Sequence, residues 1–533
     1  NARDANARTM SQTFGAMRAR AAPARDLRAP RARRCASGRG IASAPTRCAV
    51  AAERATPGQG QTQHTMVMKF GGSSVADATR MREVASIILS FPEHMPVVVL
   101  SAMGKTTNNL LLAGEMAMDC EGTEEVEALE PIRAIRALHE DTMAELGTDE
   151  DTTNEVRRLL KKLEQVCTGI ALMQEVTPRT RALLVSFGER MSTRIFASFL
   201  RSNGVNGEQV DTIDDMFVTT DEFENGTILD ATYAKTKARL TLSAGAEPTV
   251  RVVTGFLGRG VDTDAICTLG RGGSDLTATV IGKALGLKEV QVWKDVDGVL
   301  SADPRLVNST VPMPFLSFQE ATELAYFGAQ VLHPHSMRPA MDSTDLSVRV
   351  KNSYNIGAPG TVIGHSRGED LHKDWLLTSI VQKKDVTMLD ITSTRMLGQF
   401  GFLAKVFTVM AANKISVDVV ATSEVSVSLT LDPSKLWSRD LQQAELEKLV
   451  EDFEKEGIAH VDVSSGYSII SLIGNVERNN EIMERSFHAL RAADIKVSMV
   501  SQGASKTNIS LLVNRTQGDE AVRAIHAEFF EFE

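Results

Sequence analysis

The chain has 533 residues, a length that predicts two or three domains because one hydrophobic core rarely serves more than about 250–300 residues. Its net charge of -10 hides an asymmetry: residues 1–65 hold twelve Arg, no Lys and three acidic residues, or +9, so the remainder carries -19. An acidic body argues against nucleic acid as the main partner, and the chain has no run of about 18 apolar residues that would predict a membrane span.

The first 65 residues are rich in Ala, Arg, Ser and Pro and show no pattern that could bury a core. This composition predicts an organellar transit peptide, with a plain disordered tail as the alternative. Residue 1 is Asn, so Met10 is the expected true start, and residues 48–52 are the expected processing region.

Residues 66–365 alternate β-rich apolar runs with helical patterns, which predicts an α/β domain with a mostly parallel central sheet. The expected strands include residues 97–100, 183–185, 250–253 and 290–293, and a charged helical region is expected over 123–175. The pattern breaks near residues 364–370. A linker and one further strand are therefore expected over 366–385.

A repeat of about 80 residues follows the linker. Its two copies, 386–460 and 461–533, each show the order strand, helix, strand, strand, with helices expected over 402–412 and 482–492. This order is the opening of a ferredoxin-like βαββαβ unit. Two small copies behind a larger α/β domain indicate a regulatory role.

The most informative loop is residues 69–75 (KFGGSSV), which follows the apolar run 66–68. Paired glycines let backbone N–H groups approach an anion, the following helix N-terminus favours negative charge, and Lys69 adds a positive charge. The loop therefore predicts a phosphate site, with a plain turn as the alternative.

Two apparent nucleotide motifs fail. Residues 104–106 (GKT) resemble the end of a P-loop, but position 99 is Val, and residues 270–275 (GRGGSD) resemble a dinucleotide fingerprint, but Asp275 stands at its last glycine. What remains is a set of polar loops, each expected after a strand, where open α/β sheets bind ligands. These loops are residues 69–74, 101–108, 186–190, 268–275, 293–298, 303–305 and 327–334.

Together these loops resemble the aspartate kinases of the amino-acid kinase family, over residues 67–530. The segments 431–438 (LDPSKLWS) and 501–505 (SQGAS) resemble the monofunctional plant-type plastid enzymes. The resemblance implies transfer of the ATP γ-phosphoryl group to the β-carboxylate of L-aspartate, the amino-acid kinase fold, two C-terminal ACT domains and a plastid location. The repeats would pair between chains, so a homodimer is expected, and residues 377–381 are expected to be a strand donated to the second repeat.

The resemblance also implies residue roles. Catalysis would rest on Lys69, Asp275 and Arg271. The aspartate pocket would be lined by Ser101, Thr107, Glu189 and Arg271, with Glu189 on the α-ammonium. The nucleotide would be met by Lys69, Gly72, Ser73, Lys294, Asp295, Asp303, Arg305, Gln330 and Val331.

ATP and Mg²⁺ are the expected cofactors, and no protein metal site is expected. Mg²⁺ would be carried on phosphates and waters. Many microbial relatives have lysine where this chain has Gln330, and we expect Lys294 to compensate for the missing charge. For Asp295 and Arg305 the alternatives are a turn former and a surface charge.

The first repeat is the expected effector site, because residues 396–403 place free N–H groups at a helix start, whereas Glu477, Glu481 and Glu484 would repel a carboxylate at the matching place in the second. The resemblance implies L-lysine as the effector, and S-adenosylmethionine as a possible co-inhibitor. The implied lysine ligands are Met396, Gln399, Phe402, Leu403, Ser416, Val417, Asp418, Ser423 and Glu424.

Three alternatives stay open or are set aside. Another amino-acid kinase, such as a glutamate or acetylglutamate kinase, is disfavoured by the two-ACT tail and residues 186–189. A fusion to homoserine dehydrogenase is not expected, because the chain stops at Glu533. A catalytically impaired amino-acid sensor remains the main alternative because of Gln330.

Overall fold

The computed structural model describes residues 63–531 apart from 244, 330, 366–374, 393–400, 414, 424–425, 432–433, 436–438, 441–442, 456–459, 475 and 504. The expected leader, including Met10, therefore lies outside the described residues, except for positions 63–65.

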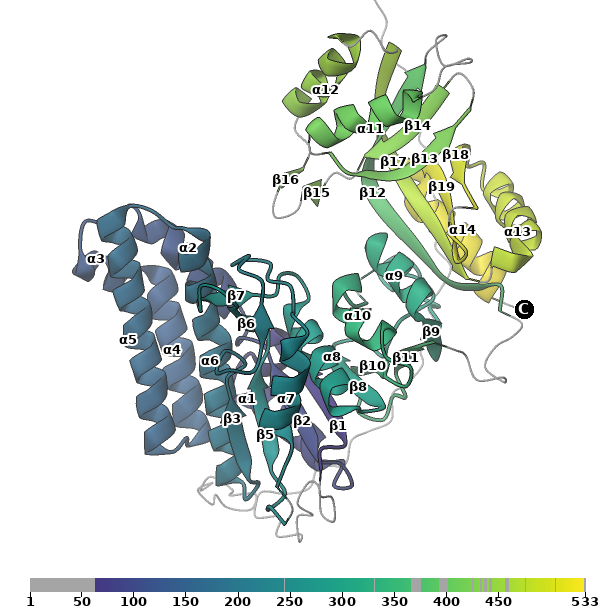
Figure 1. Ribbon diagram of the computed structural model, residues 1–533. Helices are drawn as coiled ribbons and strands as arrows, with labels where there is room; N and C mark the ends of the chain where they lie inside the picture. The colour runs from purple at the N-terminus through teal and green to yellow at the C-terminus, as the bar shows by residue number, and fades with distance from the viewer. Residues whose placement is uncertain are drawn as a thin grey trace, which may run out of the picture. The chain divides into compact units, whose positions relative to one another are not determined.

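An eight-stranded sheet forms the centre of the N-terminal domain, in the order β3-β5-β2-β1-β8-β10-β11-β9 (Figure 1). Its strands are β1 (Met66–Phe70), β2 (Pro96–Leu100), β3 (Gly207–Val210), β5 (Val250–Thr254), β8 (Glu289–Lys294), β9 (Phe315–Ser317), β10 (Ser347–Asn352) and β11 (Thr361–Gly364). All neighbours are parallel except β10 and β11, which are antiparallel. Every residue of β1 and β2 is buried, as expected for strands covered on both faces. The predicted α/β class is confirmed.

Helices cover this sheet, and α3 to α6 lie side by side (Figure 1). The helices are α1 (Ala78–Leu89), α2 (Thr106–Ala117), α3 (Thr123–Ala128), α4 (Glu130–Leu146), α5 (Glu150–Met173), α6 (Pro178–Ser202), α7 (Ala231–Leu240), α8 (Gly273–Leu285), α9 (Phe318–Tyr326) and α10 (Pro334–Met341). A small sheet adds β4 (Val218–Thr219), β6 (Leu257–Gly260) and β7 (Ile266–Thr268).

One predicted strand was wrong. Residues 183–185 lie inside α6, and so do residues 186–190, which we expected to be a loop. Thr177 caps this helix by accepting a hydrogen bond from Thr180 N, and Pro178 occupies its first turn. The middle of α6 is buried around most of its circumference, and its apolar run at residues 182–185 is no longer than a strand, so this run alone does not distinguish the two.

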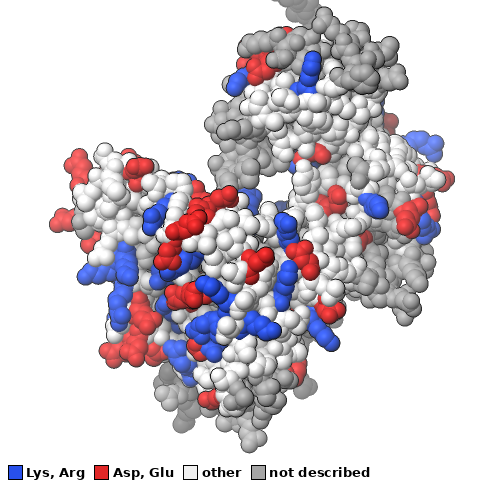
Figure 2. Space-filling view, viewed as in Figure 1, with Lys and Arg blue, Asp and Glu red and all other residues white. Residues whose placement is uncertain are grey.

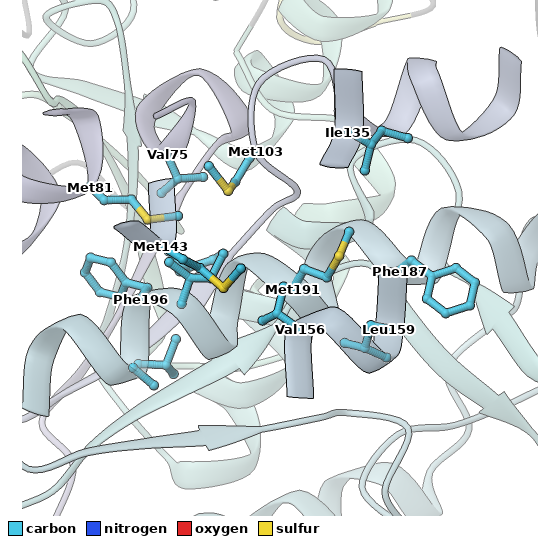
Figure 3. Close-up of a cluster of buried hydrophobic side chains, with 14 of the residues drawn as sticks. Val75, Met81, Met103, Ile135, Met143, Val156, Leu159, Phe187, Met191 and Phe196 are labelled. Atoms are coloured by element: carbon cyan, nitrogen blue, oxygen red, sulfur yellow. The ribbon is translucent and has the colours of Figure 1, made fainter. Parts of the chain in front are cut away.

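A buried cluster joins these helices to the loops at the edge of the sheet. Figure 3 shows part of it, with side chains from α1, α4, α5 and α6. Val75 and Met103, which directly follow the loops after β1 and β2, are fully buried in the same cluster. These loops are therefore anchored to the core.

The C-terminal part contains a second sheet, in the order β13-β14-β12-β17-β19-β18. Its elements are β12 (Leu377–Thr392), α11 (Phe402–Ala412), β13 (Val417–Thr422), β14 (Ser426–Leu431), α12 (Gln443–Lys455), β17 (His460–Gly474), α13 (Asn479–Ala492), β18 (Val497–Ser501), β19 (Asn508–Asn514) and α14 (Gly518–Phe530), with a short hairpin of β15 (Ser434–Lys435) and β16 (Arg439–Asp440). The repeated order strand, helix, strand, strand is confirmed.

Two long strands connect the repeats. The first half of β12 pairs with the second half of β17, from Leu377 opposite Gly474 to Val381 opposite Ser471. The second half of β12 pairs with β14 and with the first half of β17. The expected domain boundaries near 385 and 460 stay predictions, and the first coincides with an irregularity of β12 between Lys383 and Val386.

Candidate active site

The carboxyl ends of four strands lie level along one edge of the large sheet. Phe70 of β1 is opposite Leu100 of β2 and Trp293 of β8, and Lys294 is opposite Asn352 of β10. The loops that follow these strands meet at this edge, which is where ligands bind in open parallel sheets.

The loop after β1 is pressed onto the loop after β2. Gly72 and Ser73 open the short helix η1 (Gly72–Val75), and Gly104 N donates a hydrogen bond to Gly72 O (3.0 Å). A Cβ on Gly72 would lie only 2.7 Å from Ala102 O. Glycine is therefore required here by the close approach of two backbones.

Lys69 and Asp275 form a buried ion pair at this edge. Lys69 Nζ lies 2.6 Å from Asp275 Oδ1, and both side chains are 11% exposed. Asp275 reaches this position from the first turn of α8, which Gly272 opens in the left-handed conformation (φ 71°). The helix N-terminus and the Lys69 ammonium both stabilise the Asp275 carboxylate.

Lys294 is the third charged group of the cluster. It ends β8, and its ammonium donates a hydrogen bond to Val331 O. Burial lowers the pKa of Lys294 and outweighs the nearby Asp275 carboxylate, which raises it, while Lys69 lowers it further. Two ammonium groups thus lie near one carboxylate. The cluster carries a net positive charge, which attracts a polyanion such as a nucleoside triphosphate.

A second group of side chains lies beside the loop after β2. Glu189 of α6 accepts a hydrogen bond from Ala102 N (3.3 Å), and its other oxygen has no partner among the described residues. Burial raises the pKa of Glu189 to about 8. Ser101 Oγ donates to Ser274 Oγ (3.1 Å), and Thr107 lies half-buried in the first turn of α2. A buried carboxyl with a spare oxygen beside hydroxyl groups suits the ammonium of an amino acid.

Arg271 joins this edge from the loop between β7 and α8. A Cβ on the adjacent Gly272 would lie 2.6 Å from His333 Cβ, so the two loops are in close contact. Burial lowers the pKa of His333, and the charges of His335 and Arg271 lower it further. The Arg271 guanidinium thus lies near enough to His333 to lower the pKa of its imidazole, and it precedes Asp275 by four positions along the chain.

Not every predicted nucleotide residue joins the cluster. Arg305 pairs with Asp303 (2.7 Å) and its side chain is 81% exposed, so these two charges serve each other rather than the Lys69 group. Asp295 is exposed directly after Lys294. Val331 contributes its carbonyl oxygen, and Gln330 lies outside the described residues.

Sequence reasoning missed Ser274 and His333, although both stand in loops that it singled out. Ser274 partners Ser101, and His333 packs against Gly272. A sequence pattern favours charged residues over a serine or a histidine as candidate site residues. Only their positions next to other site residues in the structure identify these two.

The expected effector residues gather less fully. Met396, Gln399 and Glu424 lie outside the described residues. Phe402 is buried at the start of α11, Leu403 and Ser416 are exposed, and Ser423 hydrogen-bonds with Ser426. Val417 and Asp418 begin β13, where the Asp418 carboxylate is paired with Lys383 (2.6 Å).

On the face drawn in Figure 2, basic and acidic residues are interspersed. No helix in the described ranges is long and apolar enough to cross a membrane. The same ranges contain no group of three or more His, Cys, Asp and Glu residues that could hold a metal ion.

The comparisons with known proteins agree with this geometry. The amino acid kinase family model matches residues 64–352, and an ACT domain model matches residues 470–529. The chain is 59% identical over 467 residues to aspartokinase 1, chloroplastic, of Arabidopsis thaliana, covering 88% of this chain and 80% of the relative. The chain belongs to the aspartokinase family.

Two solved aspartokinase structures resemble the whole described fold. Escherichia coli aspartokinase III in complex with lysine and aspartate (T-state) is 32% identical with a TM-score of 0.70, covering 87% of this chain and 99% of that one. The same enzyme in complex with aspartate and ADP (R-state) is 32% identical with a TM-score of 0.71, covering 88% and 100%. The predicted aspartokinase fold is therefore confirmed for this chain.

Proposed function

We propose that the chain is an aspartate kinase that transfers the γ-phosphoryl group of ATP to the β-carboxylate of L-aspartate and forms 4-phospho-L-aspartate. This reaction is the first step of lysine, threonine and methionine biosynthesis. The observation that carries the proposal is the buried cluster of Lys69, Asp275 and Lys294 beside Glu189 at one edge of the sheet. The relatives, which are aspartokinases, lend no support to an inactive amino-acid sensor.

The reaction needs positioning and charge neutralisation more than proton transfer. An oxygen of the aspartate β-carboxylate attacks the γ-phosphorus, the bond to the bridging oxygen breaks, and ADP leaves with its electrons. Because a carboxylate is already ionised at pH 7, no general base is required. Lys69 and Lys294 neutralise the transferred group, and Asp275 holds the Lys69 ammonium in place.

Substrate recognition follows from the second group of side chains. Glu189 would pair with the α-ammonium of aspartate, and Arg271 would grip a substrate carboxylate through its planar guanidinium. Ser101 and Thr107 would line the pocket. Since Glu189 is protonated in the empty protein at pH 7, aspartate binding would release a proton from it.

Mg²⁺ would enter with the nucleotide. Among the described residues, two ammonium groups are available to the phosphates, and no group of carboxylates could by itself hold the metal ion. We propose that phosphate oxygens and water hold the ion, with Asp295 the nearest exposed carboxylate along the loop after β8. When bound, Mg²⁺ neutralises charge on the phosphates.

Regulation would come from the ACT domains. We propose that L-lysine inhibits the enzyme by binding at the first repeat, with Asp418 among its ligands, and that S-adenosylmethionine acts as a possible co-inhibitor. The complex of E. coli aspartokinase III with lysine supports the first of these. We also propose a homodimer through the ACT domains. The plastid location is supported by the chloroplastic relatives.

Hydroxamate trapping tests the activity directly. The mature protein with ATP, Mg²⁺ and L-aspartate should yield aspartyl hydroxamate when hydroxylamine is added, and L-glutamate should yield none. Lys69→Met should reduce the signal about 100-fold or more, since preorganised charge is a major source of catalysis. A folded wild-type protein that gives no hydroxamate would show that the chain is not an aspartate kinase.

A further inference from the structure

The carboxylate of Asp418 already has an ammonium partner within its own chain. Lys383 Nζ lies 2.6 Å from Asp418 Oδ2, and the exposed fractions of the two side chains are 15% and 0%. A fully buried carboxylate must be paired or protonated, because an unpaired buried charge is costly. The partner is a lysine side chain, which carries the same primary ammonium as the proposed effector.

Two irregularities of the sheet bring this pair together. The register of β12 shifts between Lys383 and Val386, and Asp385 in between has a left-handed backbone (φ 61°). The neighbouring Lys384 pairs instead with Asp519 of α14 (2.7 Å). Successive residues of a strand face opposite sides of the sheet, so the two adjacent lysines pair with different carboxylates.

The bulge of β13 falls on Asp418 itself. The register against β14 skips from Val417 to Val419, so Asp418 is the residue at the irregularity. In the second repeat the register of β18 skips in the same way from Val497 to Met499, and the residue passed over is Ser498. Only the first repeat therefore presents a carboxylate at this place.

A side chain of the kinase domain also contacts Asp418. Tyr326 donates its hydroxyl hydrogen bond to Asp418 Oδ1 (3.1 Å) from the end of α9. Two other residues of α9 bond to the ACT sheet: Glu320 accepts from Thr378 (2.7 Å), and Glu323 accepts from Asn508 (3.2 Å). Positions 320, 323 and 326 are three apart, so they share one face of the helix.

The contact with Tyr326 leads on to the active site. Phe327, next along the chain, is buried, and Gly328 has a positive φ (100°) in the segment between α9 and α10, which also contains Val331. Val331 O accepts the hydrogen bond from Lys294, the third member of the catalytic cluster. A change in the position of the Asp418 side chain can therefore alter the position of Lys294 through the short segment from Tyr326 to Val331.

We propose that Lys383 is an internal stand-in for the effector: its ammonium holds the Asp418 carboxylate in the active enzyme, and an incoming lysine displaces it. Displacement exchanges one ammonium for another, so Asp418 stays paired throughout. When the ammonium partner of Asp418 changes, the hydrogen bond between Tyr326 and Asp418 changes with it, and this shifts α9 and the loop that contacts Lys294. The inference rests on the proposed inhibition by lysine at the first repeat.

An internal competitor weakens effector binding by mass action. The apparent dissociation constant is the intrinsic one divided by the fraction of protein whose site is open, and Lys383 makes that fraction small. Lys383→Met removes the competitor, so lysine should bind at least about tenfold more tightly. Lys384→Met removes the same charge from the next residue and should leave the dissociation constant unchanged.

The experiment measures lysine binding by calorimetry and inhibition by initial rates in the intact protein. Lys383→Met should lower both the dissociation constant and the half-inhibitory concentration, and the gain should vanish when Asp418→Asn is added. Tyr326→Phe should bind lysine at least as tightly as the wild type but retain more activity at saturating lysine.

The outcomes separate the two proposals. Wild-type protein that neither binds lysine nor is inhibited by it would end the proposed regulation and this inference with it. Wild-type protein that binds lysine, with an affinity that folded Lys383→Met leaves unchanged or weaker, would overturn the inference alone. If Lys383→Met fails to fold, Tyr326→Phe with unchanged maximal inhibition would overturn the link to α9.

Discussion

At the scale of single residues, the site depends on burial shifting the charge state of ordinary side chains. Glu189 and Lys294 are both removed from water, and burial moves their pKa values in opposite directions, up for the acid and down for the base. A substrate ammonium would restore Glu189 to its charged form, and bound phosphates would favour the charged form that Lys294 already has. Burial thus favours two ligands, one with an ammonium group for Glu189 and one with a polyphosphate for Lys294.

The first prediction concerns Glu189. Because its pKa in the free protein is about 8, kcat/KM for aspartate should rise with pH up to about 8 as the carboxylate forms. Glu189→Gln should lower kcat/KM for aspartate roughly 100-fold, since losing one partner of a buried charge pair costs about 2–5 kcal/mol. It should also flatten this limb of the pH profile. A glutamine variant with the wild-type profile would show that Glu189 does not meet the substrate.

The same group affects stability with a definite sign. The folded state holds the Glu189 proton up to about pH 8, whereas the unfolded chain releases it near 4.5. Between these values the folded state binds more protons, so its stability falls as pH rises. Glu189→Gln should remove this loss, which thermal unfolding at pH 6 and pH 8 would measure.

The second prediction concerns Lys294, which we expect to supply the charge that Gln330 does not. Lys294→Met should lower kcat about 100-fold, because an ammonium near the transferred phosphoryl group is lost. Lys288→Met, at the exposed residue just before the same strand, is the matched control and should retain wild-type rates. Unchanged kcat in Lys294→Met would contradict the expected compensation.

At the scale of elements, α6 packs against the loop after β2 and fixes its position. Gly188 lies in the middle of this helix, and a Cβ there would fall 2.6 Å from Ala102 Cβ. The same loop residue donates its backbone N–H to Glu189. The helix therefore fixes both the carboxyl and the loop that it contacts.

The third prediction is that Gly188→Ala pushes this loop away. Overpacking should cost about 1–3 kcal/mol of unfolding free energy despite the better helix propensity of alanine. The displaced loop should lower kcat/KM for aspartate by up to about 100-fold. Gly169→Ala in α5 is the control, since a Cβ there meets nothing within 4 Å, and it should stabilise by up to about 1 kcal/mol.

At the scale of the whole molecule, β12 connects the two parts of the chain by hydrogen bonds to the loop after β8. Ile380 N donates to Ser301 O (2.8 Å), and Ser379 Oγ donates to Leu300 O (2.9 Å). Ser301 Oγ also lies 2.8 Å from His526 Nε2 of α14. The strand whose first half pairs with β17 thus also holds the loop that continues to Asp303 and Arg305.

The fourth prediction concerns acid stability. Burial lowers the pKa of both His64 and His139 to about 4, so the folded protein keeps them neutral while the unfolded chain takes up protons below about 6.5. Stability should therefore fall as pH drops from 6.5 to 4, by up to about 3 kcal/mol for each group. His139→Leu should reduce this acid loss in thermal unfolding. A variant that loses stability in parallel with the parent would contradict it.

Much of the fold could be predicted because its signals are local. The buried strands β1, β2, β5 and β8 follow from uninterrupted apolar runs, and α11 was predicted with its observed bounds. The strand predicted at residues 183–185 was wrong because a short apolar run does not distinguish a strand from a segment of a buried helix. The site loops could be predicted from their glycines. At Gly72 and Gly272 a neighbouring loop lies too close for a Cβ, so these positions require glycine, which is visible in the sequence.

The sequence by itself determined the α/β class, the repeated C-terminal unit and the residue types of an anion-binding edge, because periodicity and glycine placement are short-range properties of the chain. Only the tertiary structure decided that Lys69, Asp275 and Lys294 form one cluster, that Glu189 is buried, and that Asp418 is paired with Lys383. These contacts join residues far apart along the chain, and the charge state of each group depends on which neighbours exclude water from it.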